Sequence, residues 1–127
     1  MNIEDARILI VEDDQIMSTY VSASLRRMGV HQIECCPDGA SGLKVAVDYK
    51  PDLILTDIHM QPMDGFAFVQ GLRRSMHLGV RNIPVIFLSA DASSAALEQA
   101  IPLGVVGYIV KPPRFETLRA KLELALK

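Results

Sequence analysis

Short runs of branched aliphatic residues alternate with longer amphipathic stretches along the chain, and this alternation restricts the fold more than any other feature. The runs are too short for buried helices and are rich in β-branched residues, which favours strands. We expect strands at residues 7–11, 30–35, 53–56, 83–88 and 105–110. Strands that alternate with helices predict an α/β fold, with a single doubly wound parallel sheet, helices on both faces and right-handed crossovers.

Five helices are expected between and after these strands. They begin after capping residues and cover roughly residues 15–28, 40–49, 64–76, 94–100 and 114–126. The first helix is expected to stop at Gly29 and to bury Ile16, Met17, Tyr20, Val21, Ser24, Leu25 and Met28. The second should turn Leu43, Ala46 and Val47 inward. Pro102 should end or kink the fourth helix early, because a proline ring clashes with the carbonyl four residues before it.

Length and composition indicate one domain over residues 1–127 with an aliphatic core, since 50% of the residues are hydrophobic and only 6% aromatic. The net charge of −2 provides no basic surface for nucleic acid. No apolar run reaches about 18 residues and the chain starts with polar residues, so we expect a cytoplasmic protein without a membrane span or signal peptide. Whether an effector domain follows Lys127 stays open at this stage.

The two cysteines, Cys35 and Cys36, are adjacent in the sequence. Two neighbouring cysteines make no disulfide framework, and no nearby His or Cys completes a metal site. We expect small buried residues at the end of a strand, in a reducing compartment.

Polar residues follow four of the five predicted strands. Glu12, Asp13 and Asp14 follow the first strand, Asp57 the third, Ser89 the fourth and Lys111 the fifth. In a sheet of order 2-1-3-4-5, strands one and three are neighbours, and ligands bind at the carboxyl ends of the strands. Converging carboxylates repel one another, by about 1 kcal/mol in water and about 4 kcal/mol near an effective dielectric of 20. An open site lined by oxygens suits Mg²⁺, and the ammonium of Lys111 suits a phosphoryl group.

Each of these residues has an ordinary alternative role. Asp13 or Asp14 can cap a helix, Asp57 can lie in a turn, and Ser89 can be a turn hydroxyl. Their shared position at one sheet edge favours a common site over separate local roles.

Four segments together resemble the receiver domain of two-component response regulators, a flavodoxin-like family that includes the chemotaxis receivers. They are Ile8–Asp14, Pro51–Met60 with Met63–Gly65, Ile83–Ala90 and Gly107–Pro112. The resemblance covers nearly the whole chain. As a set, in this order and spacing, the segments are specific to the family.

The resemblance implies a role for each site residue. Asp57 would accept the phosphoryl group. Asp13, Asp57 and the His59 backbone carbonyl would bind Mg²⁺, with Glu12 acting through a metal-bound water. Ser89, followed by the small Ala90, resembles the switch hydroxyl, and Tyr108 the aromatic residue that turns inward on activation. Lys111 would pair with a phosphoryl oxygen, and the Lys111–Pro112 bond is expected to be cis.

The family also implies partners. A histidine kinase or phosphotransfer protein would be the phosphodonor. The fourth helix, fifth strand and fifth helix, at about 94–100, 105–110 and 114–126, would form the surface that controls an output domain, another protein or a second copy of the chain. The chain would then be no enzyme beyond its own phosphorylation and dephosphorylation.

Two positions invite separate expectations. The family usually has proline four residues after the phospho-acceptor, where this chain has Gln61 followed by Pro62, so the loop should take a different path. His59 and Asp91 each lie two residues beyond a site residue, where they would tune the lifetime of the phosphorylated form. Exposed polar side chains without a kinetic role are an equal alternative.

Two other functions compete with a phosphorylated receiver. One is an aspartate-nucleophile phosphohydrolase, which typically has a second Asp two residues after the nucleophile, where this chain has His59. The other is a receiver-like interaction domain that is never phosphorylated, whose natural mark would be the loss of one of the five residues Glu12, Asp13, Asp57, Ser89 and Lys111.

Overall fold

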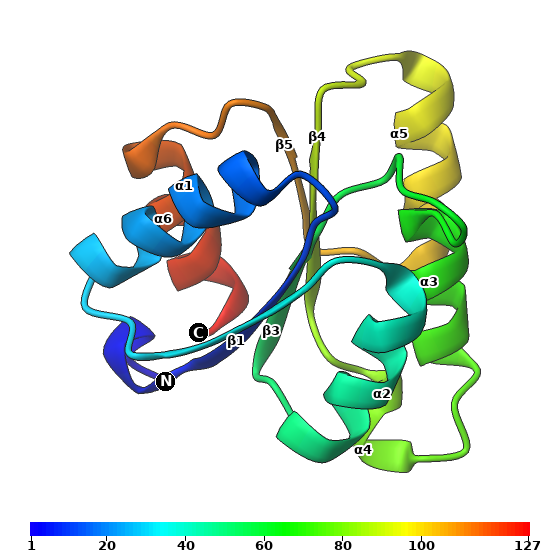
Figure 1. The fold of residues 1–127 in the computed structure, drawn as a ribbon, viewed down its shortest axis with the longest axis horizontal. Coiled ribbons are helices and arrows are strands. Elements are labelled where there is room, and N and C mark those ends of the chain that lie inside the picture. Colours follow the sequence, from blue (N-terminus) through cyan, green and yellow to red (C-terminus); the bar gives the residue numbers. More distant parts are fainter.

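Five parallel strands form one sheet in the order β2-β1-β3-β4-β5 in the computed structural model, which describes all of residues 1–127 (Figure 1). The strands are β1 (Arg7–Val11), β2 (Gln32–Cys36), β3 (Leu53–Thr56), β4 (Val85–Ser89) and β5 (Gly107–Val110). The predicted doubly wound α/β fold and strand order are confirmed. Strand β2 starts two residues later than expected, and so do β4 and β5.

Six helices surround the sheet, one more than expected. They are α1 (Gln15–Arg27), α2 (Gly39–Tyr49), α3 (Gly65–Arg73), α4 (Leu78–Arg81), α5 (Ser94–Ala100) and α6 (Phe115–Ala125), with 3-10 turns η1 (Ile3–Asp5) and η2 (Ile101–Leu103). The single helix predicted to run to Met76 stops at Arg73. The Ser75 hydroxyl accepts the His77 N–H, a local turn that competes with helix, and α4 forms afterwards. None of the helices has both the length and the apolar character needed to cross a membrane.

The sheet separates two apolar cores. Helices α1 and α6 cover one face of the sheet, and α2 and α3 cover the other (Figure 1). Ile8 and Ile10 of β1 belong to the core on the side of α1 and α6, whereas Leu9 and Val11 belong to the core on the side of α2 and α3. This alternation follows from the two-residue period of a strand. Because both faces are covered, β1, β3 and β4 are buried along nearly their whole length.

The predicted inner face of α1 is wrong at two positions. Val21, Ser24, Leu25 and Met28 are buried, but Ile16 is 84% exposed and Tyr20 is 45% exposed. With about 3.6 residues per turn, Ile16 lies roughly 140° around the helix from Val21, on the far side from the sheet. Tyr20 lies on the flank, where its hydroxyl donates a hydrogen bond to the Pro113 carbonyl (2.9 Å).

Two further expectations have mixed outcomes. In α2, Ala46 is buried as expected, whereas Leu43 and Val47 are half-buried. Cys36 is buried, but Cys35 is exposed on the edge strand β2, where no further strand covers it.

The early end of the fourth predicted helix is confirmed. Helix α5 ends at Ala100, and the chain tightens into η2, which contains Pro102 and ends at Gly104 with φ of +67°. The half-buried Arg73 of α3 donates hydrogen bonds to the carbonyls of Leu103, in η2 (3.0 Å), and of Ile83, before β4 (2.8 Å). Arg73 therefore joins the end of α3 to the segments that enter β4 and β5.

Candidate functional site

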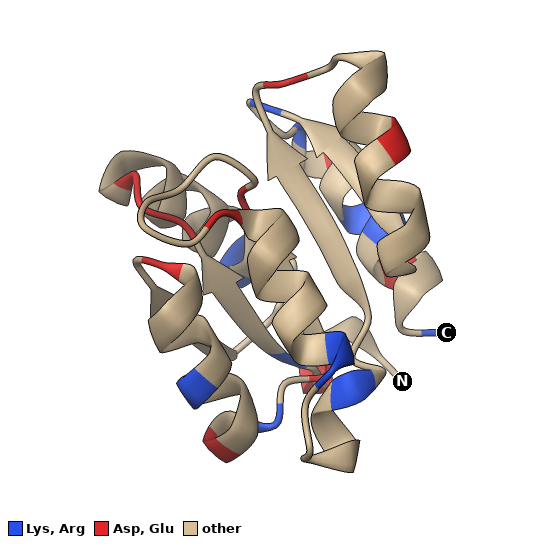
Figure 2. Ribbon diagram, turned by 90° about the vertical axis from the view of Figure 1, so that its right-hand side faces the viewer, with Lys and Arg blue, Asp and Glu red and all other residues tan.

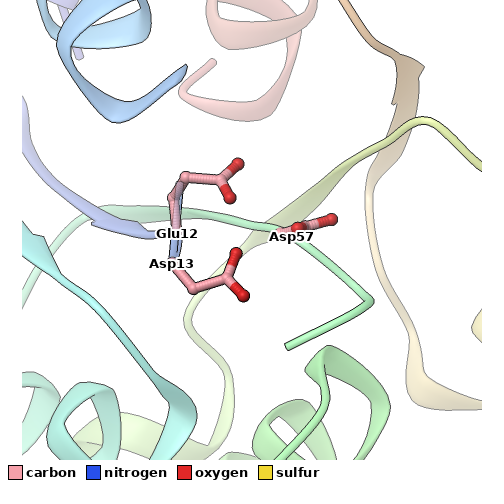
Figure 3. Close-up of side chains that lie close together, drawn as sticks. All are labelled: Glu12, Asp13 and Asp57. Carbon is pink, nitrogen blue, oxygen red and sulfur yellow. The ribbon is translucent and has the colours of Figure 1, made fainter. Parts of the chain in front are cut away.

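Glu12, Asp13 and Asp57 meet at the carboxyl edge of the sheet, as predicted. Strands β1 and β3 are paired so that Val11 lies opposite Thr56, which places the residues that follow them side by side. The Asp57 N–H donates to the Val11 carbonyl (3.0 Å) and continues the pairing by one residue. One carboxylate oxygen from each acid lies within 4.8 Å of the other two (Figure 3). Glu12 and Asp57 are buried, and Asp13 is exposed.

Lys111 lies against two of these acids. Its N–H donates to the Ser89 carbonyl (2.9 Å), which carries the β4–β5 pairing past the end of β5. Its Nζ is 2.5 Å from Glu12 Oε1 and 3.2 Å from Asp57 Oδ2. Lysine, rather than a shorter residue, reaches across from β5 to the end of β1, and the predicted convergence of these residues is confirmed.

The electrostatics of the cluster indicate an excess of negative charge. Burial raises the pKa of the Glu12 carboxyl to about 7, although hydrogen bonds from Lys111 and the Asp14 N–H act in the other direction. Burial lowers the pKa of the Lys111 ammonium, but the hydrogen bond to Glu12 and the charge of Asp57 outweigh it, so the net direction is upward. Burial is the main cause and the charge of Asp57 adds to it, so Glu12 retains a proton more readily than an exposed glutamate.

The donor set fits a divalent cation. The three converging side chains offer only carboxylate oxygens, the ligands that Mg²⁺ prefers, and the exposed Asp13 leaves one side open to water. A cation here would reduce the repulsion from Asp57, which adds to the effect of burial on the pKa of Glu12. The Asp57 Oδ1 atom also accepts the Ile58 N–H (2.7 Å), which holds the side chain in place.

The loop after Asp57 contains His59, whose ring is exposed, and a cis peptide bond between Gln61 and Pro62. The sequence did not predict the cis bond before Pro62. The cis bond that was expected between Lys111 and Pro112 is present. Gly65 closes the loop, since its N–H donates to the Ile58 carbonyl (2.7 Å). The role of the His59 carbonyl as a metal ligand stays a prediction.

Ser89 and Tyr108 both contact the backbone of Asp91. Ser89 ends β4 and is fully buried, and its Oγ accepts the Asp91 N–H (3.0 Å). The Tyr108 hydroxyl donates to the Asp91 carbonyl. The Tyr108 ring packs edge-on against Phe87, with 6.2 Å between ring centroids, and Phe87 packs edge-on against Phe66 (5.5 Å). Ala90, between Ser89 and Asp91, is exposed.

Sequence reasoning placed His59 and Asp91 near the site but missed that they contact each other. His59 Nε2 lies 3.0 Å from Asp91 Oδ2, which joins the loop after β3 to the loop after β4. Hydrogen bonds from Ser93 and then from His59 lower the pKa of Asp91 to about 2. The contact could have been found from the sequence, because His59 lies two positions after Asp57 and Asp91 two positions after Ser89, and these two residues lie at the ends of neighbouring strands.

Acidic residues occupy the loops at this end of the sheet (Figure 2). A cavity of about 230 Å³ lies beside the acids and is lined by Glu12, Asp13, Gln15, Ser18, Cys35, Cys36 and Pro37. A larger cavity of about 520 Å³ lies between the end of α2 and α4, and none of the predicted site residues lines it. The predicted site residues therefore lie at the carboxyl edge of the sheet and not in the larger cavity.

Comparison with known proteins agrees with this geometry. The model of the response regulator receiver domain matches residues 8–123. A probable chemotaxis protein CheY of Rhizobium etli is 29% identical over 94% of this chain and 92% of its own length. The transcriptional regulator RpaA of Synechocystis is 34% identical over 95% of this chain, which spans only 49% of that regulator.

A solved structure is similar at the level of the fold. The receiver domain of the sensor histidine kinase PA1611 from Pseudomonas aeruginosa, with a magnesium ion coordinated in its active site cleft, superposes with a TM-score of 0.85. The two chains are 28% identical, and the match covers 95% of this chain and 97% of that one. Because the family model matches most of the chain, this protein belongs to the response regulator receiver domain family.

Proposed function

We propose that this receiver domain accepts a phosphoryl group on Asp57, with Mg²⁺ as its cofactor, as part of a two-component system. The observation that carries the proposal is the convergence of Asp57 with Glu12, Asp13 and Lys111 at one edge of the sheet. The phosphodonor would be a histidine kinase or phosphotransfer protein in the cytoplasm. The chain would act on no external substrate and would catalyse only its own phosphorylation and dephosphorylation.

In the proposed reaction a carboxylate oxygen of Asp57 forms a new bond to phosphorus. The bond between phosphorus and the donor's leaving atom breaks, and the leaving atom keeps the electron pair. A carboxylate is a weak nucleophile, so positioning and charge neutralisation provide most of the rate. The Ile58 N–H orients the carboxylate, and the Lys111 ammonium, already 3.2 Å from Asp57, is placed to pair with a phosphoryl oxygen.

Asp13 and Asp57 would hold Mg²⁺ together with the His59 carbonyl, and Glu12 would act through a water. When bound, the cation neutralises charge on the transferring phosphoryl oxygens. The exposed position of Asp13 leaves an approach for the cation from solvent.

Phosphorylation would change a second surface through Ser89 and Tyr108. A phosphoryl group adds roughly −1.5 to −2 charges and strong acceptor oxygens at Asp57. These would attract the Ser89 hydroxyl, which now binds the Asp91 N–H, and free space for the Tyr108 ring. The surface made by α5, β5 and α6 would then change and control an output domain, a partner protein or a second copy of the chain. Leu97, Ile101 and Val110 are exposed apolar residues on α5, η2 and β5, and Val106 is exposed directly before β5.

Intact-protein mass spectrometry tests the proposal. The protein is incubated with acetyl phosphate and Mg²⁺, with Asp57→Asn as the control. We expect one phosphoryl adduct in the parent, none in Asp57→Asn and none after chelation of Mg²⁺. Rapid turnover of an external phosphoester would instead support a phosphohydrolase, and the absence of any adduct would support an interaction domain that is never phosphorylated.

We also propose that His59 and Asp91 tune the lifetime of the adduct, because both border the approach of water to Asp57. Decay of the adduct is followed by mass after removal of the donor. His59→Ala and Asp91→Ala are expected to change the decay rate, and unchanged rates would refute the idea.

A further inference from the structure

Asp91 makes four hydrogen bonds, each to a different part of the carboxyl edge. Its N–H donates to the Ser89 hydroxyl oxygen (3.0 Å), and its carbonyl accepts from the Tyr108 hydroxyl. Its Oδ1 accepts the Ser93 N–H (2.9 Å), and its Oδ2 lies 3.0 Å from His59 Nε2. One residue thus contacts both switch residues through its backbone, and the start of α5 and the opposite loop through its side chain.

The division between backbone and side chain has a mechanical consequence. Ser89 and Tyr108 bind atoms that any residue at position 91 would provide. They keep these bonds only while the backbone at position 91 stays in place. The carboxylate holds that backbone from two directions, from Ser93 within the same loop and from His59 across the gap between the loops after β3 and β4.

We propose that the Asp91 carboxylate and the His59 ring form a latch that holds Ser89 and Tyr108 in the positions seen in this structure, with no phosphoryl group present. The inference rests on the proposed function for what the switch does when the latch opens. Asp91 and His59 are positioning residues here, because they act through the backbone of the loop. The claim concerns the resting equilibrium of the switch and is separate from the lifetime of the adduct.

The size of the effect follows from the exposure of the pair. The His59 side chain is 65% exposed and that of Asp91 is 28% exposed, so water competes for their hydrogen bond. Exposed pairs of this kind typically shift an equilibrium by about twofold to fivefold. A latch of that strength would shift the populations of the two conformations of Ser89 and Tyr108 only slightly. Phosphorylation could therefore still change which conformation dominates.

Two readouts without phosphodonor or Mg²⁺ test the latch. The chain has three tyrosines, so 3-fluorotyrosine labelling gives three ¹⁹F signals, and Tyr108→Phe identifies the one of interest. Amide hydrogen exchange at residue 91, corrected for the intrinsic rate of each variant, reports its bond to Ser89. In both Asp91→Ala and His59→Ala we expect exchange about twofold to fivefold faster and a displaced Tyr108 signal.

Matched variants separate the latch from general loosening. Ser94→Ala removes an exposed hydroxyl in the first turn of α5 that makes no hydrogen bond to Asp91 or His59, and His31→Ala removes an exposed histidine elsewhere. Both should behave like the parent. His59→Gln, which keeps a donor near Asp91, should restore part of the protection. The double variant Asp91→Ala with His59→Ala should not exceed Asp91→Ala alone, because Asp91→Ala already removes the bond to His59.

The proposal is overturned if Asp91→Ala leaves both readouts unchanged, or if Ser94→Ala disturbs them as much as Asp91→Ala does. The outcome is independent of the phosphorylation experiment. A parent that forms no adduct but shows the expected shifts would refute the proposed function and retain the latch. If the parent forms the adduct but the Tyr108 signal is the same in the parent, Asp91→Ala and His59→Ala, the proposed function is retained and the latch is refuted.

Discussion

Asp13 differs from the other acids of the site because it is exposed while Glu12 and Asp57 are buried. It contributes repulsion without being fixed by an ion pair, since Lys111 contacts the other two acids. Asp13 is therefore the acid of the cluster without a positively charged partner, and a bound cation would supply one.

Replacement of Asp13 by Asn should stabilise the protein in the absence of Mg²⁺ by about 1 kcal/mol, because one of three like charges is removed near water. The same change should weaken the stabilisation that added Mg²⁺ gives the parent. Urea unfolding with and without MgCl₂ measures both effects. Asp5→Asn, at a carboxylate outside the cluster, is the control, and an Mg²⁺ response that is equal in parent and Asp13→Asn would contradict the assignment.

Helix α3 begins directly against the loop that follows Asp57. A Cβ built on Gly65 would lie 2.2 Å from the Asp57 carbonyl oxygen and 2.8 Å from Ile58 Cα, both of them backbone atoms. Only glycine lets the first turn of α3 pack this closely against the loop that follows the phospho-acceptor. The start of the helix and the position of Asp57 are therefore linked.

Gly65→Ala should lose about 3 kcal/mol of unfolding free energy and slow adduct formation, because the backbone at Asp57 must move. Gly79→Ala is the matched control, since nothing lies within 4 Å of its added Cβ and alanine favours helix α4. Chemical denaturation and adduct mass report the two effects. If both glycine variants had the same stability, the close packing at Gly65 would not matter.

Helix α3 is also joined to the opposite end of the sheet through Arg73. Besides Leu103 and Ile83, its guanidinium donates to the Arg81 carbonyl (2.9 Å). Arg73→Met should cost about 2 kcal/mol, because carbonyls at half-buried positions lose a charged donor. Arg74→Met, on the exposed neighbour, should change stability by less than about 0.5 kcal/mol. Equal urea midpoints for the two variants would show that the Arg73 contacts carry no net stability.

At the scale of the molecule, the two ends of the sheet have different tasks. The carboxyl end carries the acids, Lys111 and the latch, whereas the other end carries Arg73, α4 and the largest cavity. The rigid central strands, buried on both faces, lie between them. A charge change at Asp57 should therefore be felt at the edge and along β5, and little at the far end.

Hydrogen exchange before and after phosphorylation by acetyl phosphate should show this asymmetry. We expect altered protection in peptides that cover 57–66, 87–93 and 105–111, and unchanged protection at 47–52 and 77–80. The residues in the first group surround the latch and Tyr108, and those in the second line the distant cavity. Changes spread evenly over both groups would contradict a local switch.

Much of the fold could be predicted because its signals are local. The aliphatic runs, the caps Asp14, Asp38, Asp64 and Ser93, and the stop at Gly29 specify elements through neighbours in the sequence. The site was predictable because parallel strands bring their ends to one edge. The exposure of Ile16, the extra helix α4 and the cis bond before Pro62 were missed, since each depends on packing or on a loop path that no local period encodes.

The sequence by itself determined the α/β class and the membership of the acidic site, because periodicity and the placement of polar residues at strand ends are properties of the chain alone. The strand order was expected from the resemblance to receiver domains. Only the tertiary structure decided that Lys111 reaches Glu12 as well as Asp57, and that Asp91 contacts His59 and Tyr108 together. Such contacts join residues tens of positions apart through side-chain reach and loop shape. These are set by how the elements pack, and no spacing along the chain records them.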